Sequence, residues 1–269
     1  LGGNIAFNKT KIKDLGVPLS NTIVNGNQVQ RSFYLGDAIS TGSFFKTPGN
    51  IFMEGEEIGM FYGWETDGIY QTGDDLDVAG VQAGDIRRVD QLTVDTDGDG
   101  VADSVDGVID INDRTFIGNP NPDFIYGLNL AVTYKNFNLN VLANGVYGNE
   151  IANGNLYKGF NTTGIGNIFT AAYEDAWSVD NPSTIYPRIG YTGDNIAQSI
   201  DDRIIEDGSY FRLSNVTLGY DVPVDNILEK LNIYVSATNL LTITDYSGFN
   251  PDITSFSHNG NIIGVDWNS

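Results

Sequence analysis

The sequence predicts an all-β fold with strands long enough for a transmembrane antiparallel β-barrel. Apolar and polar residues alternate over segments of roughly ten residues, about the length that a tilted strand needs to cross a bilayer. The polar positions carry Asn, Thr and Ser, where a soluble sheet usually carries charged residues. Short and long connections alternate between the segments, as in membrane barrels. The pattern alone leaves open a soluble β-sandwich with Asn-rich strands.

Composition and charge exclude several classes of function. The 269 residues include no Cys and a single His, His258, which rules out disulfides and argues against a His-rich zinc site or a Ser-His-Asp triad. The formal net charge of −21 repels nucleic acid, and the sequence shows no basic patch. No run of about eighteen apolar residues is present, so we expect no transmembrane helix.

Two strands are expected in the first half of the chain. The first covers residues 4–12, and the second covers residues 84–94 (GDIRRVDQLTV), just before an acidic segment. Neither continues into a long alternating pattern. The first half therefore predicts strands without fixing their direction.

The clearest strands lie in the second half, at residues 128–134, 137–141, 215–220 and 231–238. Their period of two predicts one apolar and one polar face for each strand. Lys135 and Asn136 form a tight turn between the first two. Aromatic residues lie near the strand ends, where an interfacial girdle is expected: Tyr134, Phe137, Tyr147, Tyr210, Phe211 and Tyr220.

The connections differ greatly in length. Residues 221–230 form a short connection, whereas residues 148–207 and 242–262 are long and irregular, apart from a short helix expected at residues 169–177. In barrels of this type the short turns are periplasmic and the long loops are outside. Loop length therefore places the Lys135–Asn136 turn in the periplasm and residues 148–207 outside.

Several segments in order resemble one family. They are EGEEIGMFYGWETDGIYQT (54–72), GDIRRVDQLTVDTDGDG (84–100), DRTFIGNPNPDFIYGLNLAVTYKNFNLNV (113–141), DRIIEDGSYFRLSNVTLGYDVP (202–223) and LNIYVSATNLLTITDYSGFNPDI (231–253). Together they resemble the carboxy-terminal barrel portion of a SusC/RagA-type TonB-dependent outer-membrane transporter. The resemblance covers nearly the whole chain.

The resemblance implies that residues 1–269 are a partial TonB-dependent receptor β-barrel domain, the carboxy-terminal part of a plugged barrel of about 22 strands. The plug and the early strands of the family would be absent, and the last strand would be absent too, since the chain stops at GVDWNS. The family lies in the outer membrane of Bacteroidota-type bacteria and imports oligosaccharides or peptides.

The resemblance also implies several partners. They are a SusD-like surface lipoprotein, TonB through the missing amino-terminal region, outer-membrane lipid on the apolar strand faces, and a homodimer of transporter pairs. On the polar faces, Asn129, Asn140, Asn144, Asn232 and Thr238 would line the lumen with neutral groups suited to uncharged polar cargo.

The acidic segment DTDGDGVADSVD has the ligand spacing of a calcium loop. Its candidate ligands are Asp95, Asp97, Asp99, the Val101 carbonyl, Asp103 and Asp106, with Gly100 at the turn. The twelfth position is Asp rather than a bidentate Glu, and no amphipathic helices flank the loop. These features predict a structural Ca²⁺ that stiffens an outer loop rather than a calcium sensor. The alternative is a solvated acidic turn.

Aromatic residues in the long loop suggest weaker candidates. Tyr157, Phe160 and Tyr191 could contact a ligand or the lid, because aromatic faces stack on sugar rings. The alternative is that they pack the loop down. Trp177 matches a family position that looks structural. Arg188 and Arg203 are expected to pair with loop acids.

No catalytic residues are predicted. The carboxylate pairs 74–75, 174–175 and 201–202 are adjacent in sequence, so they would point to opposite sides of an extended chain and represent surface loop charge. A jelly-roll glycoside hydrolase needs two converging carboxylates, and no such pair is evident. The remaining alternative is a secreted calcium-stabilised β-sandwich carbohydrate-binding module, which would carry charged outer strand faces.

Overall fold

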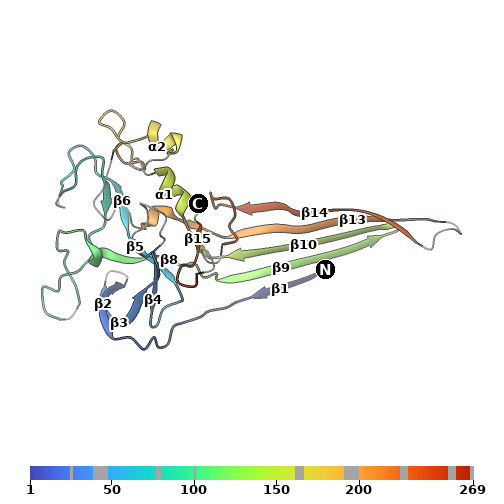
Figure 1. The fold of residues 1–269 in the computed structure, drawn as a ribbon, viewed down its shortest axis with the longest axis horizontal. Coiled ribbons are helices and arrows are strands. Elements are labelled where there is room, and N and C mark those ends of the chain that lie inside the picture. The colour runs from blue at the N-terminus through green and yellow to red at the C-terminus, as the bar shows by residue number, and fades with distance from the viewer. Residues whose placement is uncertain are drawn as a thin grey trace. The chain divides into compact units, whose positions relative to one another are not determined.

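The computed structural model in Figure 1 describes residues 1–24, 27–38, 48–76, 80–99, 101–160, 167–190, 200–224, 230–253 and 259–266. The chain divides into two compact units. Unit 1 comprises Leu1–Lys9, Asn121–Glu150 and Asp207–Asp252, and unit 2 comprises Thr10–Pro120, Ile151–Glu206 and Ile253–Ser269. Each unit is therefore assembled from three separate stretches of sequence.

Unit 1 is one antiparallel sheet with the strand order β1-β9-β10-β13-β14. Its strands are β1 (Gly2–Ala6), β9 (Phe124–Tyr134), β10 (Phe137–Tyr147), β13 (Tyr210–Val222) and β14 (Leu231–Thr244). The four long strands and their antiparallel pairing confirm the all-β prediction, and the sheet is open within the described residues. The first strand ends at Ala6, so the prediction of a strand over residues 4–12 was too long.

The β9–β10 hairpin confirms the predicted tight turn. Tyr134 pairs with Phe137, which leaves Lys135 and Asn136 as the whole connection. Lys135 has a φ of 52°, the left-handed conformation common in two-residue hairpin turns. At the opposite end of the sheet the chain leaves for unit 2 three times, after β1, β10 and β14. All the long insertions therefore depart from the end opposite this turn.

The two faces of the unit 1 sheet differ as the alternation predicts. One face carries apolar side chains that stay exposed, including Leu128 at 47%, Ile233 at 60% and Val235 at 67%. The described part of unit 1 places no second sheet on this face, which argues against the β-sandwich alternative. The other face carries mainly Asn, Thr and Ser.

A register shift in β13 lets the two faces continue past a break in the sequence pattern. Leu142 pairs with Asn215 and the next residue, Ala143, pairs with Leu213, so Ser214 is an extra residue on β13. The alternation therefore reverses at Ser214. Leu213 shares the apolar face with Val216, although strict alternation would place these two residues on opposite faces.

Aromatic residues cluster at both ends of the apolar face. Tyr134 and the Phe137–Tyr220 pair, with ring centroids 4.8 Å apart, lie at the turn end, and Phe124 stacks on Tyr147 at 5.0 Å at the other end. Tyr210 departs from the girdle prediction. Its side chain is buried beneath the Arg212 guanidinium, 4.8 Å from the ring centroid.

Unit 2 contains three small sheets. Their strand orders are β2-β3-β4-β5-β8, β6-β7 and β12-β11-β15. The strands are β2 (Leu19–Val24), β3 (Asn27–Leu35), β4 (Asn50–Met53), β5 (Met60–Trp64), β6 (Thr66–Ile69), β7 (Ile86–Arg88), β8 (Arg114–Gly118), β11 (Glu150–Asn153), β12 (Ile205–Asp207) and β15 (Val265–Asp266). The helices are α1 (Gly154–Phe160) and α2 (Thr170–Glu174), with 3₁₀ turns at Ile111–Asp113 and Asp202–Ile204.

Two sequence predictions for this region need correction, and one holds. Residues 84–94 form only the three-residue strand β7, because their pairing with β6 is brief. Residues 148–207 are not a long irregular loop, since they include β11, both α-helices and β12. The short helix predicted at residues 169–177 is confirmed as α2.

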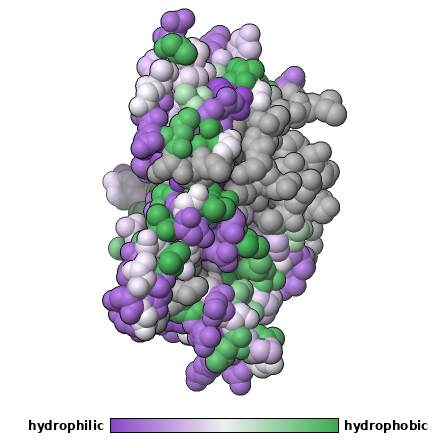
Figure 2. All heavy atoms as spheres, turned by 90° about the vertical axis from the view of Figure 1, so that its left-hand side faces the viewer, coloured by the Kyte–Doolittle hydropathy of each residue, from purple (hydrophilic) through white to green (hydrophobic). Residues whose placement is uncertain are grey.

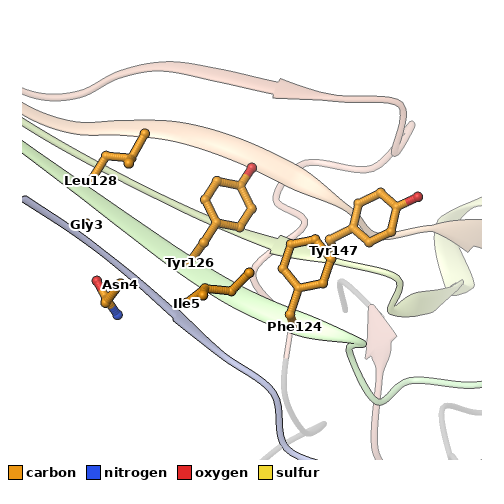
Figure 3. Close-up of a pocket in the computed structure, with 7 residues that line it drawn as sticks. All are labelled: Gly3, Asn4, Ile5, Phe124, Tyr126, Leu128 and Tyr147. Atoms are coloured by element: carbon orange, nitrogen blue, oxygen red, sulfur yellow. The ribbon is translucent and has the colours of Figure 1, made fainter.

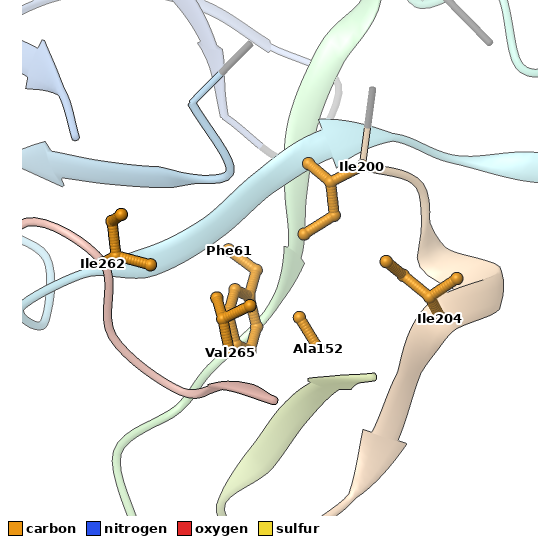
Figure 4. Close-up of a cluster of buried hydrophobic side chains, with 6 residues drawn as sticks. All are labelled: Phe61, Ala152, Ile200, Ile204, Ile262 and Val265. Carbon is orange, nitrogen blue, oxygen red and sulfur yellow. The ribbon is translucent and has the colours of Figure 1, made fainter. Parts of the chain in front are cut away.

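The main core of unit 2 joins side chains from distant stretches of the chain (Figure 4). Its buried members come from β5, β11, the Asp202–Ile204 turn and the last described segment: Phe61, Ala152, Ile200, Ile204, Ile262 and Val265. A second cluster holds Ile51, Met53 and Tyr62. These contacts order segments whose sequences show no long periodicity.

Arg114 is fully buried at the start of β8. Its Nη2 donates to the carbonyls of Pro48 at 2.6 Å and Tyr62 at 2.7 Å, and its guanidinium lies 4.7 Å from the Tyr62 ring centroid and 5.2 Å from that of Trp64. Burial lowers the pKa of Arg114 to about 10. Arg114 therefore joins three segments through carbonyl and aromatic contacts.

Trp177 ties the segment after α2 to the β6–β7 hairpin, which confirms its predicted structural role. Its Nε1 donates to the Gln71 side chain at 3.0 Å, and its ring lies against Gly84, where any Cβ would clash with it. Arg188 pairs with Asp85 at 2.7 Å and Arg203 with Asp201 at 2.6 Å, so the predicted arginine–acid pairs also form.

The surface seen in Figure 2, from the left-hand side of Figure 1, mixes hydrophilic and hydrophobic residues among its coloured atoms. None of the described helices has both the length and the hydropathy required to cross a membrane. On the unit 1 sheet, by contrast, large exposed apolar residues follow one another along a single face.

Candidate functional site

The polar face of the unit 1 sheet is the first candidate site. Its side chains bond to one another across strands: Thr217 and Ser236 hydroxyls lie 2.7 Å apart, and the Asn215 amide donates to Ser236 at 3.1 Å. Near the turn end this face is hollowed by about 550 Å³. Asn140 and Asn232, two of the predicted lumen residues, line this hollow. The arrangement presents neutral hydrogen-bonding groups to anything passing along the face.

A carboxylate and an ammonium group, those of Asp221 and Lys230, also line this hollow. Asp221 accepts hydrogen bonds from the amides of Asn138 at 2.9 Å and Asn232 at 3.0 Å, and Lys230 Nζ lies 3.6 Å away. The charge is thus held by two neutral donors and one partly exposed cation. Sequence reasoning missed Asp221, although it is one of two charged residues in β13.

The second charged residue of β13 lies near the opposite end of the strand. Arg212 donates to Thr242 at 3.1 Å and to Asn250 at 2.7 Å, and it pairs with Asp252 at 3.3 Å. The β13 segment FRLSNVTLGYD carries charges only at Arg212 and Asp221. The isolation of these two charges in an otherwise uncharged segment is the feature of the sequence that could have identified both residues.

The acidic loop is the second candidate site. One carboxylate oxygen from each of Asp95, Asp97 and Asp99 lies within 4.8 Å of the others. These carboxylates also shape the turn, because Asp95 accepts from the Gly98 amide at 2.7 Å and Asp99 accepts from the Val101 amide at 2.8 Å. Three hard oxygen ligands therefore converge, which suits Ca²⁺.

The other predicted ligands of this loop have different contacts. Asp103 accepts from the Thr96 amide at 3.0 Å and from the Thr96 hydroxyl, and Asp106 accepts from the Val108 amide at 2.9 Å. Val101 is exposed, and Gly100 lies outside the described residues. An antiparallel β-bridge between Val94 and Ser104 closes the loop, in place of the two helices of an EF-hand.

The predicted ligand or lid residues are only partly described. Phe160 ends α1, and its ring packs edge-on against Phe169 at 5.8 Å and Tyr186 at 5.4 Å. Tyr157 lies within α1, but its side chain is outside the described residues, as is all of Tyr191. The described residues therefore place Phe160 in an aromatic cluster, and the predictions for Tyr157 and Tyr191 lie outside them.

Buried carboxylates are a feature of unit 2 that sequence reasoning did not find. Asp113 is 1% exposed, and desolvation raises its pKa to about 6 despite backbone hydrogen bonds from Gln91 and Asp110. Burial also raises the pKa of Asp90 and of Asp202. Asp202 accepts from both the amide and the hydroxyl of Thr66. These groups hold turns together.

The adjacent carboxylate pairs have mainly structural contacts. Asp74 accepts from the Gln71 amide at 2.8 Å and pairs with Arg87 at 2.9 Å. Asp201 is buried, so the prediction that it is a surface charge was wrong. Its ion pair with Arg203 compensates the cost of burying the carboxylate. These contacts place Asp74 and Asp201 in ion pairs with neighbouring arginines.

Comparisons with known proteins give consistent relatives, although no family model matches the chain. The chain is 36% identical over 236 residues to TonB-dependent receptor P3 of Formosa agariphila, covering 85% of this chain and 22% of that protein. It is 29% identical over 215 residues to TonB-dependent receptor P26 of the same organism, covering 77% of this chain and 20% of that protein. The chain thus spans about a fifth of each relative's length.

Solved structures agree on the fold. The structure of the RagAB peptide transporter aligns with a TM-score of 0.66 and 22% identity, covering 98% of this chain and 25% of that chain. The same peptide importer in its closed-closed state aligns with a TM-score of 0.61 at 21% identity, covering 98% of this chain and 25% of that chain. The relatives are receptors and transporters rather than enzymes.

Proposed function

Because this chain belongs with the TonB-dependent receptors, we propose that it is of the SusC/RagA type and forms part of an outer-membrane barrel that imports oligosaccharides or peptides. The observation that supports this proposal most directly is the difference between the two faces of the unit 1 sheet. The sheet exposes one apolar face and one uncharged polar face over strands of 11 to 14 residues. The chain would supply wall and outer surface, with no catalytic chemistry.

The dimensions of the apolar face support a membrane-spanning role. Phe124 and Tyr134 are ten residues apart on β9, or about 33 Å along a strand at about 3.3 Å per residue. A strand tilt of about 40° reduces this to roughly 25 Å, which is the height of the apolar band in outer-membrane barrels. The aromatic clusters would then lie at the two interfaces, and lipid would cover the side chains between them.

The connections support the orientation. The Lys135–Asn136 turn would face the periplasm, and the insertions at the other end of the strands, which build unit 2, would lie outside.

The remaining parts of the proposal concern partners. A SusD-like lipoprotein would close over the outer side, TonB would supply energy through another region of the polypeptide, and two transporter pairs would form a homodimer.

The neutral polar face supports polar cargo. Its hydroxyl and amide groups can exchange hydrogen bonds with sugar hydroxyls or peptide groups without holding either by charge. Asp221 and Arg212 mark the two ends of β13, so charged parts of a cargo would meet them on entry or exit. Both cargo classes fit this wall.

We also propose that Asp95, Asp97 and Asp99 hold a structural Ca²⁺, with the Val101 carbonyl, Asp103 and Asp106 available to complete the shell. The converging carboxylates support this proposal. Since the bridge between Val94 and Ser104 already closes the loop, the ion would stiffen a formed turn. Opening of a helix pair is not part of this role.

Cell fractionation tests the transporter proposal. A blot with antibodies against residues 148–207 should show a polypeptide several times larger than 29.2 kDa in the detergent-soluble outer-membrane fraction. A band near that mass in the soluble or secreted fraction would instead favour the calcium-stabilised carbohydrate-binding module. Uptake of labelled neutral oligosaccharides and of labelled peptides, in cells with and without the gene, would then identify the cargo class.

A further inference from the structure

An open groove of about 550 Å³ crosses the apolar face of unit 1 (Figure 3). It lies over β1, β9 and β10, close to the strand ends from which the insertions depart. The side chains that line it are apolar or aromatic, and the Asn4 side chain points away from it, toward the opposite face. The lining residues on the apolar face are Gly3, Ile5, Phe124, Tyr126, Leu128 and Tyr147. The volume falls within the range of about 300–1,000 Å³ typical of small-ligand sites.

Two glycines shape the groove, Gly3 by leaving out a side chain in its lining and Gly145 by making room for the Tyr126 ring. Gly3 faces it, and a Cβ there would come within 3.2 Å of the Leu128 side chain. On β10, Gly145 leaves room for the Tyr126 ring, which crosses it so that its hydroxyl donates to the Tyr210 carbonyl at 3.3 Å. The Tyr126 ring is therefore held flat against the sheet by a neighbouring strand.

The rim of the groove is also fixed by ring contacts. Phe124 stacks on Tyr147 with an interplanar angle of 21°, and Phe7 contacts Phe124 at 5.6 Å. Rings held in this way keep their shape whether or not a ligand is present, which lowers the entropy cost of binding. The groove is thus an open depression with stacked rings at its rim.

We propose that this groove holds a fatty acyl chain of an outer-membrane lipid. The proposal rests on the membrane placement of the unit 1 sheet proposed above. The groove is continuous with the exposed apolar face, so a lipid chain would reach it without crossing polar surface. Transported cargo would be polar and would pass along the opposite face. The groove lies near the strand ends from which the insertions depart, so the acyl chain would belong to a lipid of the outer leaflet.

The preference for this groove must come from shape. Lipid tails are as apolar as the side chains they meet, so burial alone does not favour one lipid-facing site over another. Close contact with three rings and a glycine floor does favour it, through dispersion. We expect about tenfold enrichment of acyl chains in the groove over the flat part of the apolar face, or about 1.4 kcal/mol.

Photo-crosslinking with a defined lipid tests the proposal. The complete transporter would be reconstituted in phosphatidylethanolamine vesicles containing a trace of phosphatidylethanolamine with a diazirine in its acyl chain. After irradiation, labelled positions would be mapped by mass spectrometry. Label should concentrate on residues 124–128 and Tyr147, relative to the exposed apolar positions of β14, which lie outside this groove and serve as the internal reference.

Two neighbouring glycines provide matched variants. Gly3→Leu would fill the groove, whereas Gly2→Leu places the same side chain on the opposite face, where a Cβ meets no atom within 4 Å. Label at Tyr126 and Tyr147 should fall about tenfold in Gly3→Leu and stay unchanged in Gly2→Leu. The β14 reference should be labelled equally in both variants, which shows that each has folded and inserted.

Each other outcome overturns the proposal in a recognisable way. Even labelling of the groove and β14 would mean that the groove retains no chain. Label on β14 without label in the groove would mean that protein, such as a second copy of the chain, covers it. Absence of label from the whole apolar face would also overturn the membrane placement, and so the proposed function itself.

Discussion

Asp113 links the stability of unit 2 to acidity through a single buried carboxyl group. Its two oxygens accept from the Gln91 amide at 2.9 Å and from the Asp110 amide at 2.6 Å. Asp90 and Asp110 add like charge nearby, and burial is the largest cause of the pKa near 6. The folded protein therefore keeps a proton on Asp113 at pH values where the unfolded chain has lost it.

The pH dependence follows from this difference. Between the ordinary pKa of 3.8 and the folded pKa of about 6, the folded state binds more protons, so its stability falls as the pH rises. The loss is at most about 1.4 kcal/mol per pH unit, or about 3 kcal/mol over the window. Asp113→Asn is neutral throughout and keeps an acceptor for Gln91, so its stability should vary less. Thermal melting of the complete transporter from pH 4 to 7 checks this, and parallel curves for the two proteins would contradict it.

The acidic loop offers a second test with single residues. Asp97→Ala with Asp99→Ala removes two of the three converging carboxylates. If the ion binds as weakly as in extracellular modules, with a Kd of about 10⁻³ to 10⁻⁴ M, about 10 mM Ca²⁺ contributes roughly 1–3 kcal/mol. We expect the variant to melt at a lower temperature than wild type in Ca²⁺ and at the same temperature in chelator.

A charge-matched control separates metal binding from general electrostatics. Asp75→Ala with Asp180→Ala removes the same charge from two exposed positions outside the loop. This control should respond to Ca²⁺ like wild type. Equal destabilisation of the loop variant in Ca²⁺ and in chelator would leave the solvated acidic turn as the explanation.

At the scale of elements, the register shift at Ser214 determines which side chains lie on the apolar face of the unit 1 sheet. In an uninterrupted strand Leu213 and Asn215 would share a face, because side chains alternate with a period of two. Here Ala143 pairs with Leu213 and Leu142 with Asn215, which separates the two residues onto opposite faces. The extra residue keeps Leu213 on the apolar face and Arg212 on the polar face.

Single-cysteine labelling tests the register shift, since the chain contains no Cys. A charged, membrane-impermeant maleimide should label Asn215→Cys and leave Leu213→Cys unlabelled in the membrane-embedded transporter. On regular β10, Leu139→Cys and Val141→Cys should both be unlabelled, because they share the apolar face. Equal labelling at residues 213 and 215 would show that the alternation continues unbroken.

The elements of unit 1 were the most predictable from sequence, because patterns within short stretches of the chain specify them. A period of two over long segments and a two-residue turn at Lys135–Asn136 are enough to specify the β9–β10 hairpin. Ser214 could not be assigned as a bulge, since the shift depends on pairing with β10. In unit 2, the conformation of the described part of residues 150–207 depends on contacts with residues far away in sequence. Trp177 bonds to Gln71, for example, and Arg188 pairs with Asp85.

The candidate sites show the same division. The convergence of Asp95, Asp97 and Asp99 follows from their spacing in a tight turn, so sequence could anticipate it. The burial of Asp113 and the groove over Gly3 could not be anticipated, because both require knowledge of which strands are neighbours. Asp221 and Arg212 lie between these cases, since their isolation among uncharged residues was visible.

At the scale of the whole molecule, the unit 1 sheet must keep charge off one face. Leu128 and Asn129 are adjacent, exposed and central in β9, and they point to opposite faces. Leu128→Arg should cost about 2–4 kcal/mol at the bilayer midplane, whereas Asn129→Arg should cost little. The amount of folded transporter in the outer membrane, measured by unheated gel migration, should fall only for Leu128→Arg. An equal fall for both variants would remove the distinction between the faces.

The division of each unit among three stretches of chain also sets an order in time. The β9–β10 hairpin closes over two residues, so it can form as soon as those strands are present. The unit 2 core needs Phe61, Ile200 and Val265 together, and closing such long loops makes nucleation slow. Assembly should therefore run from the wall hairpins to the unit 2 core, which is complete only once the segment around Val265 has joined Phe61 and Ile200. A cell exporting this polypeptide must protect the early stretches until that segment arrives.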